Sequence, residues 1–378
     1  MNAVQLIQSG DYLSHYFVDD HETWKREIRM HKGLSLERLQ YQEVPDPSPK
    51  AGEVLVEVWG CGLNHLDVWA VQAPRDHLRS EPRIPGADIA GIVKSVGEGI
   101  KSVKPGDRVV LFPSLVCHNC YFCLSGRDNL CQSSGTFGSD RDGGMAEYTL
   151  APEWNVVPVP PSLSLTDAAS LPIAFLTAWH MLVGKARVRP GETVLVNAVG
   201  SGVGIAAVQI ACLLGARVLA SAGSKAKINK GLSLGAEGGI NYTTSSLCQE
   251  VMRLTENRGV DVVIDSLSGE LMEQSVEALA PGGRLVNCGC TLGNWARINM
   301  GRMLFKEATV MGSLMGSKHE LLDILQQFEA DKLRPVVDRV FPLSQAREAV
   351  AYLADRKQFG KVVVVPDSKY GRGEQGSQ

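Results

Sequence analysis

Short apolar runs that alternate with polar residues dominate the chain between Gly52 and about Val110. An alternation with a period of two predicts β-strands that bury one face. The Pro/Gly signals between the runs, such as Lys104-Pro-Gly-Asp107, predict the turns that join them. We therefore expect a compact, mostly antiparallel β domain here. Its strands are expected in GEVLVEVWG, GIVKSVG and GDRVVLF.

The pattern changes after Pro160. Apolar runs of strand length now alternate with segments of about ten residues that are predicted as helices. These helices are expected near 203–214, 247–255 and 271–279, with a further one between the second and third strands. Such alternation is typical of βαβ units and a parallel sheet. The expected strands are ETVLVNAV, ARVLASAG, GGINY, VDVVIDSL, GRLVNCG and TVMGS.

The end of the chain returns to β-rich composition. RPVVDRVFPL and GKVVVVP flank a helix predicted near 344–355, and we expect this part to rejoin the first domain. The prediction is an α/β protein with a discontinuous domain of residues 1–165 and 330–378 and an inserted domain of residues 166–329. The charge-dense segment 19–33 is interpreted as a solvated helix or loop in preference to a functional lid.

Composition narrows the class of protein. The chain has 378 residues, 44% apolar and 21% charged, which is ordinary for a globular protein of about two domains. A net charge of −3 gives no reason to expect nucleic acid or an anionic membrane as a partner. There is no uninterrupted apolar stretch of about 20 residues, and the start lacks a signal-peptide pattern. We therefore predict a soluble cytoplasmic protein.

A glycine-rich turn follows the first strand of the inserted domain. Gly200, Ser201, Gly202, Val203 and Gly204 connect a buried strand to a helix. Backbone amides at such a helix start can hold a pyrophosphate, because glycine permits close approach and the helix dipole favours an anion. The spacing differs from G-x-G-x-x-G, and a purely structural glycine turn is the alternative. The strand before and the helix after it favour dinucleotide binding.

The segment after the glycine turn suggests which dinucleotide is bound. From Ile205 to Ala236 there is no Asp or Glu to accept a hydrogen bond from the ribose 2′-hydroxyl of NAD. Ser224 and Lys225 instead end the second strand, with Lys227 and Lys230 beyond, which suits the 2′-phosphate of NADP(H). Tyr242 ends the next strand and is expected at the same edge. The alternative for the lysines is an exposed helix face.

Four of the nine cysteines lie within fifteen residues: Cys117, Cys120, Cys123 and Cys131. Four thiolates at this spacing can close a tetrahedral zinc site with no open position, and a closed site is structural. We therefore predict one structural zinc in a lobe of residues 115–133. An iron–sulfur cluster is the rival interpretation, and His118 is treated as a bystander.

Together these segments resemble the zinc-containing medium-chain dehydrogenase/reductase superfamily, and within it the quinone oxidoreductase-like branch. The resemblance covers about Leu36 to Pro366 and implies a GroES-like β domain with a Rossmann domain inserted into it. It also implies a homodimer or homotetramer and adds Thr177 to the cofactor-binding residues. Its further motifs are Cys61–Asp67, Pro85–Gly91, Val103–Val109, Asp142–Tyr148, Leu176–His180 and Phe359–Val362.

The chain departs from the family where a catalytic zinc would bind. Family members with that zinc use a cysteine, the histidine of a Gly-His-Glu segment, and a later cysteine or acid. Cys61 matches the first ligand, but Ala87 and Asp88 replace His-Glu, and Leu171-Pro-Ile-Ala-Phe supplies no third ligand. Leu63 also replaces the Ser/Thr that starts the alcohol proton relay. The resemblance therefore implies hydride transfer without a catalytic metal.

From this we expect an NADPH-dependent reductase of a quinone, an enone or a similar conjugated carbonyl. The resemblance makes Asn64 the candidate donor to the carbonyl oxygen, with turn capping as the alternative. His65 and Asp67 are candidates for proton delivery, with a structural role as the alternative. Two rival functions stay open: a zinc alcohol dehydrogenase with ligands such as Cys61, His65 and Asp88, and a catalytically idle NADPH-binding member of the superfamily.

Overall fold

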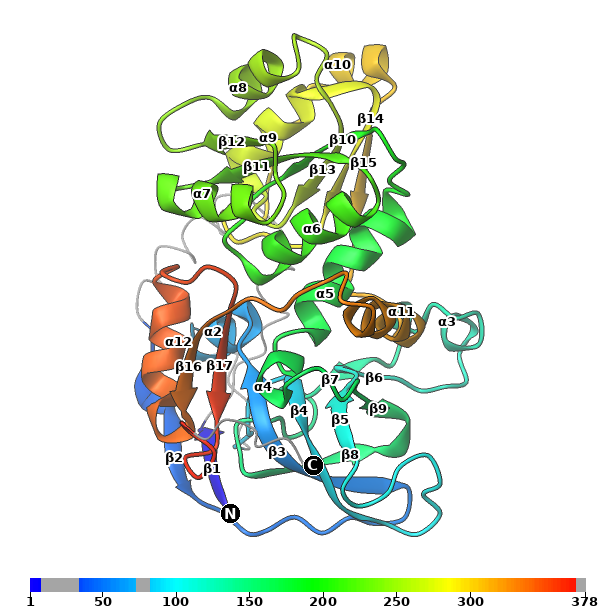
Figure 1. Cartoon of the computed structure of the whole chain (residues 1–378), viewed down its shortest axis with the longest axis vertical. Coiled ribbons are helices and arrows are strands. Elements are labelled where there is room, and N and C mark those ends of the chain that lie inside the picture. Colours follow the sequence, from blue (N-terminus) through cyan, green and yellow to red (C-terminus); the bar gives the residue numbers. More distant parts are fainter. Residues whose placement is uncertain (8–33, 73–81, 372–378) are drawn as a thin grey trace. The chain divides into compact units, whose positions relative to one another are not determined.

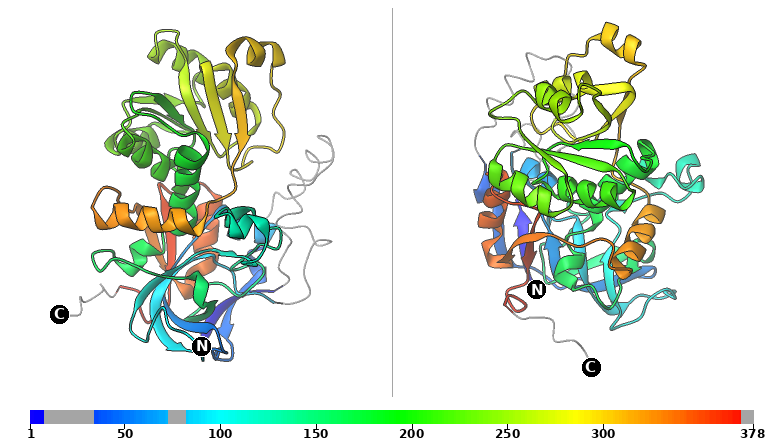
Figure 2. Two further views of the ribbon diagram at one scale, coloured as in Figure 1. Left: turned by 90° about the vertical axis from the view of Figure 1, so that its right-hand side faces the viewer. Right: turned by 45° about the horizontal axis from the view of Figure 1, so that its top comes forward.

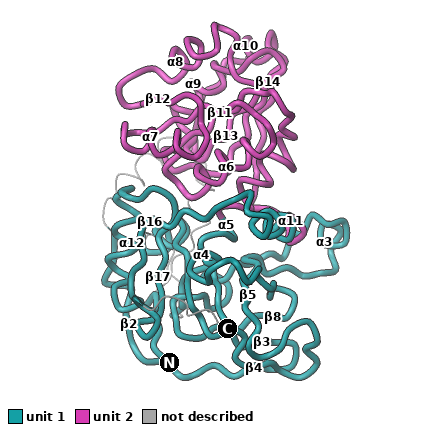
Figure 3. The backbone as a smooth tube through the Cα atoms, viewed as in Figure 1, with its two compact units in different colours: residues 1–173, 321–378 teal, residues 174–320 magenta. Residues whose placement is uncertain are grey.

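The computed structural model describes residues 1–7, 34–72 and 82–371. The chain forms two compact units (Figure 3). Unit 1 comprises Met1–Ile173 and Leu321–Gln378, and unit 2 comprises Ala174–Glu320. Unit 1 is therefore discontinuous in sequence. The charge-dense segment 19–33 lies outside the described residues.

Unit 2 is built on a six-stranded parallel sheet with the order β12-β11-β10-β13-β14-β15. This is the strand order of a Rossmann sheet, in which the order reverses beside the first strand, here β10. Its strands are β10 (Thr193–Val196), β11 (Arg217–Ala222), β12 (Gly238–Asn241), β13 (Val260–Asp265), β14 (Leu279–Asn287) and β15 (Thr309–Gly312).

Helices cover both faces of this sheet (Figure 2). Leu195, Leu219 and Leu285 of the sheet pack with Leu247 and Val276 of two covering helices in one buried cluster. All four residues of β10 are buried, as expected for a central strand between two helical layers. The helices are α6 (Gly202–Leu213), α7 (Lys225–Ser233), α8 (Leu247–Leu254), α9 (Gly269–Glu277) and α10 (Met300–Lys306).

Unit 1 contains a seven-stranded sheet with the order β16-β17-β3-β4-β5-β9, and β8 also pairs with β3. All pairs are antiparallel except β16 with β17. Because β17 pairs with β3, the C-terminal segment returns to the first domain, as the sequence predicts. The strands are β3 (Glu53–Gly62), β4 (Asp88–Val96), β5 (Arg108–Leu111), β8 (Tyr148–Pro152), β9 (Val156–Pro158), β16 (Val337–Pro342) and β17 (Lys361–Val365).

Smaller elements complete unit 1 (Figure 1). Strands β1 (Asn2–Leu6) and β2 (Leu39–Glu43) form an antiparallel pair, as do β6 (Ser114–Leu115) and β7 (Gly135–Thr136). The helices of this unit are α2 (His65–Gln72), α3 (Tyr121–Leu124), α4 (Leu165–Ala168) and α12 (Ala346–Ala354). The chain passes from unit 1 to unit 2 within α5 (Pro172–Trp179) and returns within α11 (Lys318–Glu329).

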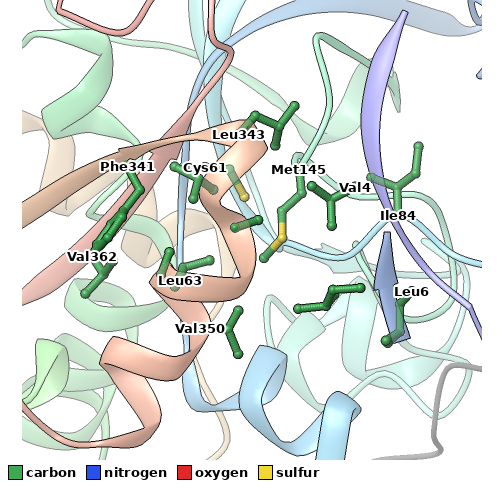
Figure 4. Close-up of a cluster of buried hydrophobic side chains, with 14 of the residues drawn as sticks. Val4, Leu6, Cys61, Leu63, Ile84, Met145, Phe341, Leu343, Val350 and Val362 are labelled. Atoms are coloured by element: carbon green, nitrogen blue, oxygen red, sulfur yellow. The ribbon is translucent and has the colours of Figure 1, made fainter. Parts of the chain in front are cut away.

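One buried cluster of unit 1 joins segments far apart in sequence (Figure 4). It brings together Val4, Leu6, Cys61, Met145, Val350 and Val362, among others. Cys61 is completely buried in it. The cluster therefore packs β1, β3, α12 and β17 around one apolar centre.

Strand β15 is the last strand of its sheet, and the neighbouring helix α10 exposes large apolar side chains. Phe305 is 88% exposed, and Met300 and Leu304 are also exposed. An unpaired strand edge beside apolar side chains is a surface that a second chain can cover. The homodimer or homotetramer implied by the resemblance stays a prediction. None of the helices in the described ranges is long and apolar enough to cross a membrane.

Candidate cofactor and catalytic residues

The glycine turn joins β10 to α6 in unit 2. The hydroxyl of Ser201 caps α6 by accepting a hydrogen bond from the Gly204 N–H at 2.9 Å. A Cβ atom on Gly204 would lie 2.3 Å from the carbonyl oxygen of Ala198, so only glycine fits there. Ala198 itself has a positive φ of 54°. The turn therefore leads tightly into α6, and the backbone N–H groups at the start of this helix can donate hydrogen bonds to a phosphate.

The ends of β11 and β12 meet beside this turn. Ser224 caps α7, and its hydroxyl accepts a hydrogen bond from the Lys227 N–H at 3.4 Å. A Cβ on Gly223 would lie 3.3 Å from the Tyr242 hydroxyl, so Tyr242 lies against the end of β11. The structure therefore brings together Ser224 and Tyr242, as the sequence predicts, at the edge where an adenosine ribose binds in this fold.

Of the three lysines that the sequence suggests for the 2′-phosphate, Lys227 lies nearest to the glycine turn in the contacts described. Its Cδ lies 2.7 Å from the position that a Cβ on Gly200 would take, so its aliphatic stem crosses the glycine turn. Lys227 is half-buried, whereas Lys225 and Lys230 are exposed. The sequence pattern places Lys225 at the end of the second strand, whereas β11 ends at Ala222 and Lys225 is the first residue of α7. Helical side chains lean towards the N-terminus of their helix, which carries Lys227, the third residue of α7, back over the turn.

Thr177 is the remaining residue predicted to bind the cofactor. It is buried in α5, and the contacts described above do not bring it into the group around the glycine turn. Its assignment stays a prediction that comes from the resemblance.

In unit 1, the buried Asp88 and Lys361 form a polar cluster with the half-buried Asn64. The Lys361 ammonium lies 2.8 Å from Asp88 Oδ2 and donates to Asn64 Oδ1 at 2.7 Å. Asn64 Nδ2 donates to the same Asp88 Oδ2 at 2.9 Å. The side chains of Lys361 and Asp88 are only 3% and 0% exposed, so this is an ion pair removed from water. Asp88 Oδ1 also accepts a hydrogen bond from the Ile173 N–H at 2.8 Å.

These contacts define how Asn64 can act. Its second amide hydrogen points to the Gly62 carbonyl at 3.3 Å, which is a longer and weaker bond than the one to Asp88. Lys361 was not singled out from the sequence. It is the only charged residue of the otherwise apolar run Lys361–Val365, and a charge at the start of a fully buried strand is the signal that could have found it.

Asp67 and His65 lie at the start of α2, which follows Asn64 directly. Asp67 Oδ2 accepts a hydrogen bond from the Asn64 N–H at 2.8 Å, so this carboxylate caps the helix start. Burial raises the pKa of Asp67 to about 6. The His65 ring lies 6.1 Å from the Trp69 ring, centre to centre. Burial, together with the charges of Arg356 and Lys361, lowers the pKa of His65 to about 4, so its imidazole is neutral at pH 7.

These two pKa values predict opposite dependences of stability on pH. The stabilising contribution of Asp67 is complete below about pH 4 and is lost as the pH rises through about 6, because folding raises its pKa from 3.8. The contribution of His65 is present above pH 6.5 and is lost as the pH falls through about 4. Each contribution amounts to about 3 kcal/mol, at about 1.4 kcal/mol per pKa unit.

The slope of the free energy of unfolding against pH, between pH 4 and 6.5, is the quantity that these substitutions change. We expect this slope to be more positive in Asp67→Asn than in the parent, and more negative in His65→Gln than in the parent. Urea denaturation of both variants and the parent at four pH values in this range measures the slopes. Slopes equal to that of the parent would contradict these pKa values.

Cys61 does not join a metal site. Its sulfur is packed against Gly86 so closely that a Cβ on Gly86 would lie 2.3 Å from it. Burial raises the pKa of this thiol well above its ordinary value, which disfavours the thiolate that a metal needs. In the described ranges, only the four-cysteine cluster places three or more potential metal ligands within reach of one ion. The rearranged zinc site of Cys61, His65 and Asp88 is therefore not assembled.

The four cysteines of the 115–133 lobe do come together. Their ligand atoms all lie within 4.8 Å of one another. The Sγ–Sγ distance is 3.5 Å for Cys120–Cys123 and for Cys117–Cys131, and 3.9 Å for Cys117–Cys123. Four sulfurs around a zinc ion at about 2.3 Å stand about 3.8 Å apart, so this arrangement fits tetrahedral zinc.

The lobe's own backbone favours the thiolate form of two of these cysteines, whereas burial raises the pKa of Cys123 to about 12. Hydrogen bonds from the backbone, chiefly the N–H of Cys123, lower the pKa of Cys120 to about 6. Backbone N–H groups of Asn119 and Cys120 lower the pKa of Cys117 as well. His118 packs edge-on against the Trp154 ring at 4.6 Å between centres, which is consistent with the bystander role expected for it.

Two family models match the chain. The model described as zinc-binding dehydrogenase matches residues 202–330, and the alcohol dehydrogenase GroES-like domain matches residues 50–161. These ranges fall on the Rossmann sheet and on the β domain, respectively. The matches agree with the two architectures described above.

Relatives cover most of the chain. Quinone oxidoreductase-like protein 2 of Bos taurus is 30% identical over 336 residues, which are 86% of this chain and 88% of the relative. The NAD-dependent alcohol dehydrogenase of Saccharolobus solfataricus is 32% identical over 337 residues, 87% of this chain and 96% of the relative. A crystal structure of an NAD-dependent alcohol dehydrogenase is 39% identical, has a TM-score of 0.86 and covers 97% of this chain and 99% of that chain.

Proposed function

Because the chain belongs to the medium-chain dehydrogenase/reductase superfamily of zinc-containing alcohol dehydrogenases and is an oxidoreductase, we propose that it reduces a quinone, an enone or a similar conjugated carbonyl with NADPH. The observation that carries this proposal is the Asn64–Asp88–Lys361 cluster. Both carboxylate oxygens of Asp88 are already engaged within unit 1. At the motif where family members with a catalytic zinc place metal ligands, this chain places the side-chain amide of Asn64, polarised by Lys361.

The proposed assignment of NADPH rests on unit 2. Bound NADPH would supply the hydride. The glycine turn with Ser201 would hold the diphosphate, and Ser224, Lys225, Lys227 and Tyr242 would surround the 2′-phosphate. Lysine ammonium groups favour a dianionic phosphate over a neutral hydroxyl, and charge-assisted bonds are stronger than neutral ones.

The proposed role of Asn64 is to donate a hydrogen bond to the carbonyl oxygen of the substrate. The Lys361 ammonium on Asn64 Oδ1 draws electron density away from the amide and makes its Nδ2–H groups better donors. The hydrogen on the long bond to Gly62 is the one that a substrate oxygen can compete for. Conjugation spreads the developing negative charge, so one neutral donor stabilises the transition state appreciably.

The cofactor assignment predicts a preference for NADPH over NADH. One charge-assisted contact to phosphate contributes about 1.5–3 kcal/mol, or about ten- to a hundredfold in affinity. The preference is the dissociation constant of NADH divided by that of NADPH, measured by quenching of tryptophan fluorescence. Lys227→Ala and Lys225→Ala should each reduce this ratio. Lys230→Ala, an exposed lysine of the same helix, is the control and should leave the ratio unchanged. Equal affinities of the parent for NADPH and NADH would contradict the assignment.

The reaction itself is tested with a panel of quinones, enones and aldehydes by following NADPH oxidation. We expect Asn64→Ala to lower kcat about a hundredfold with little change in NADPH affinity. Asn155→Ala is the matched control. This buried asparagine of unit 1 donates to the Phe112 and Ser114 carbonyls, so its loss should lower stability without changing the rate. Tight NADPH binding without turnover of any acceptor would instead favour a catalytically idle protein.

An NAD-dependent alcohol dehydrogenase is the second candidate, because two of the relatives above carry that name. It requires removal of a proton from an unactivated alcohol. If ethanol or benzyl alcohol is oxidised with NAD⁺ or NADP⁺ faster than any quinone or enone is reduced, the second candidate replaces the first.

A further inference from the structure

Asp265 lies at the carboxyl end of β13 and is completely buried. Its Oδ1 accepts a hydrogen bond from Asn197 Nδ2 at 3.0 Å, and its Oδ2 accepts from Asn287 Nδ2 at 2.7 Å and from the Ser268 N–H at 2.8 Å. These donors are neutral, so a carboxylate here carries a costly buried charge. A costly group at this position calls for a reason beyond packing.

The two asparagines connect Asp265 to two loops. Asn197 directly follows β10, three residues before Gly200 of the glycine turn, and Asn287 is the last residue of β14, directly before the segment 288–293. Asn197 has all of its amide groups engaged. Besides Asp265, Nδ2 donates to Ser275 Oγ at 2.9 Å, and Oδ1 accepts from Ser221 Oγ at 2.8 Å. The cluster thus lies under the carboxyl ends of four adjacent strands, β11, β10, β13 and β14.

The segment after β14 is held by the same cluster. Asn287 Nδ2 also donates to the Gly289 carbonyl at 2.8 Å, and the Cys288 N–H donates to the Asp265 carbonyl at 3.0 Å. Asn287 therefore fixes the backbone that follows β14. The backbone after β10 is held by the Asn197 N–H, which donates to the Ile264 carbonyl at 3.0 Å, while the Asn197 side chain bonds Asp265. In open α/β sheets, ligands bind outside the carboxyl ends of the strands, which is where both loops lie.

We propose that Asp265 is a positioning residue for dinucleotide binding, which sets the glycine turn through Asn197 and the segment 288–293 through Asn287. This inference rests on the proposed cofactor function. The carboxylate is suited to the role because it only accepts hydrogen bonds, so that it orients two side-chain amides at once. An asparagine at this position turns one of its contacts into a clash of two donors.

The experiment compares NADPH with adenosine 2′-monophosphate. The monophosphate reaches the group at β11 and β12 but has neither the diphosphate nor the nicotinamide. We expect Asp265→Asn to weaken NADPH binding about tenfold or more. The dissociation constant of adenosine 2′-monophosphate, from NMR titration, should change less than about twofold. A purely structural role would weaken both ligands together or neither, and either result would overturn the inference.

Three further variants sharpen the test. The reciprocal variant Asn197→Asp/Asp265→Asn restores a donor facing an acceptor and should recover most of the NADPH affinity. Asn287→Ala removes a single donor and replaces Asp265→Asn in the test if that variant does not fold. It should also weaken the binding of NADPH more than that of adenosine 2′-monophosphate. Thr255→Val is the control, because this buried hydroxyl bonds the Val251 carbonyl and the Gly259 N–H at the opposite end of β13. It should lower stability and leave NADPH affinity unchanged.

The parent protein separates this inference from the proposed function. If the parent binds neither NADPH nor NADH, both fail. If it binds NADPH and Asp265→Asn binds it equally well, only the positioning role fails. If it prefers NADH, the NADPH assignment fails, and the same variants are measured against NADH and adenosine.

Discussion

Purified protein is expected to contain one zinc ion per chain, held by Cys117, Cys120, Cys123 and Cys131. Structural zinc sites in small domains bind with about 10–16 kcal/mol, so no single side-chain contact in the chain is expected to contribute as much. Cys120→Ser should lose the metal and expose the 115–133 lobe to proteolysis. The hydride step should be affected only through folding or assembly.

Elemental analysis and limited proteolysis measure these outcomes. Cys248→Ser, which changes a half-buried cysteine outside the lobe, is the control and should retain zinc and the parent's resistance to protease. A zinc content near two per chain would contradict the mechanism proposed here and favour the alcohol dehydrogenase alternative.

The buried ion pair between Lys361 and Asp88 carries the second large prediction. Lys361→Met leaves the Asp88 carboxylate without a counter-charge at 0% exposure, which should lower the free energy of unfolding by about 3–5 kcal/mol. The double variant Lys361→Met/Asp88→Asn removes both charges and should recover part of that loss. Urea denaturation at pH 7 measures all three proteins.

A second ion pair of unit 1 provides the comparison. Lys369 lies 2.7 Å from Glu57, and the two side chains are 20% and 25% exposed. Because water still reaches this pair, Lys369→Met should cost only about 1 kcal/mol. If the double variant at 361 and 88 is no more stable than Lys361→Met alone, the cost does not come from an uncompensated charge.

Local patterns in the sequence were sufficient to predict the strands and helices whose apolar residues face one core. The runs ETVLVNAV and VDVVIDSL became β10 and β13, and the predicted helix 203–214 became α6 (Gly202–Leu213). The expected return of GKVVVVP to the first domain is confirmed by the pairing of β17 with β3. Helix α10 was not predicted. The pair β1–β2 was not predicted either, because β1 gains its partner only from a strand about 35 residues later.

The amino-acid sequence by itself determined the features that depend on neighbours along the chain, which are the glycine turn between strand and helix and the spacing of the four cysteines. It also determined which residue types are missing: by comparison with the family that the chain resembles, the histidine and the third ligand of a catalytic zinc site. Spacing within one loop fixes how far its groups can be from one another, and a missing residue type cannot be supplied by folding.

Only the tertiary structure decided which distant side chains meet. Lys361 pairs with Asp88 and Asn64 across nearly 300 residues, Lys227 lies across Gly200, and Asp265 receives Asn197 and Asn287. Each of these contacts depends on strand order and on the direction in which a side chain leaves its helix or strand. The buried environment that follows also sets the pKa values of Asp67 and His65, because desolvation is a property of the fold and not of the residue type.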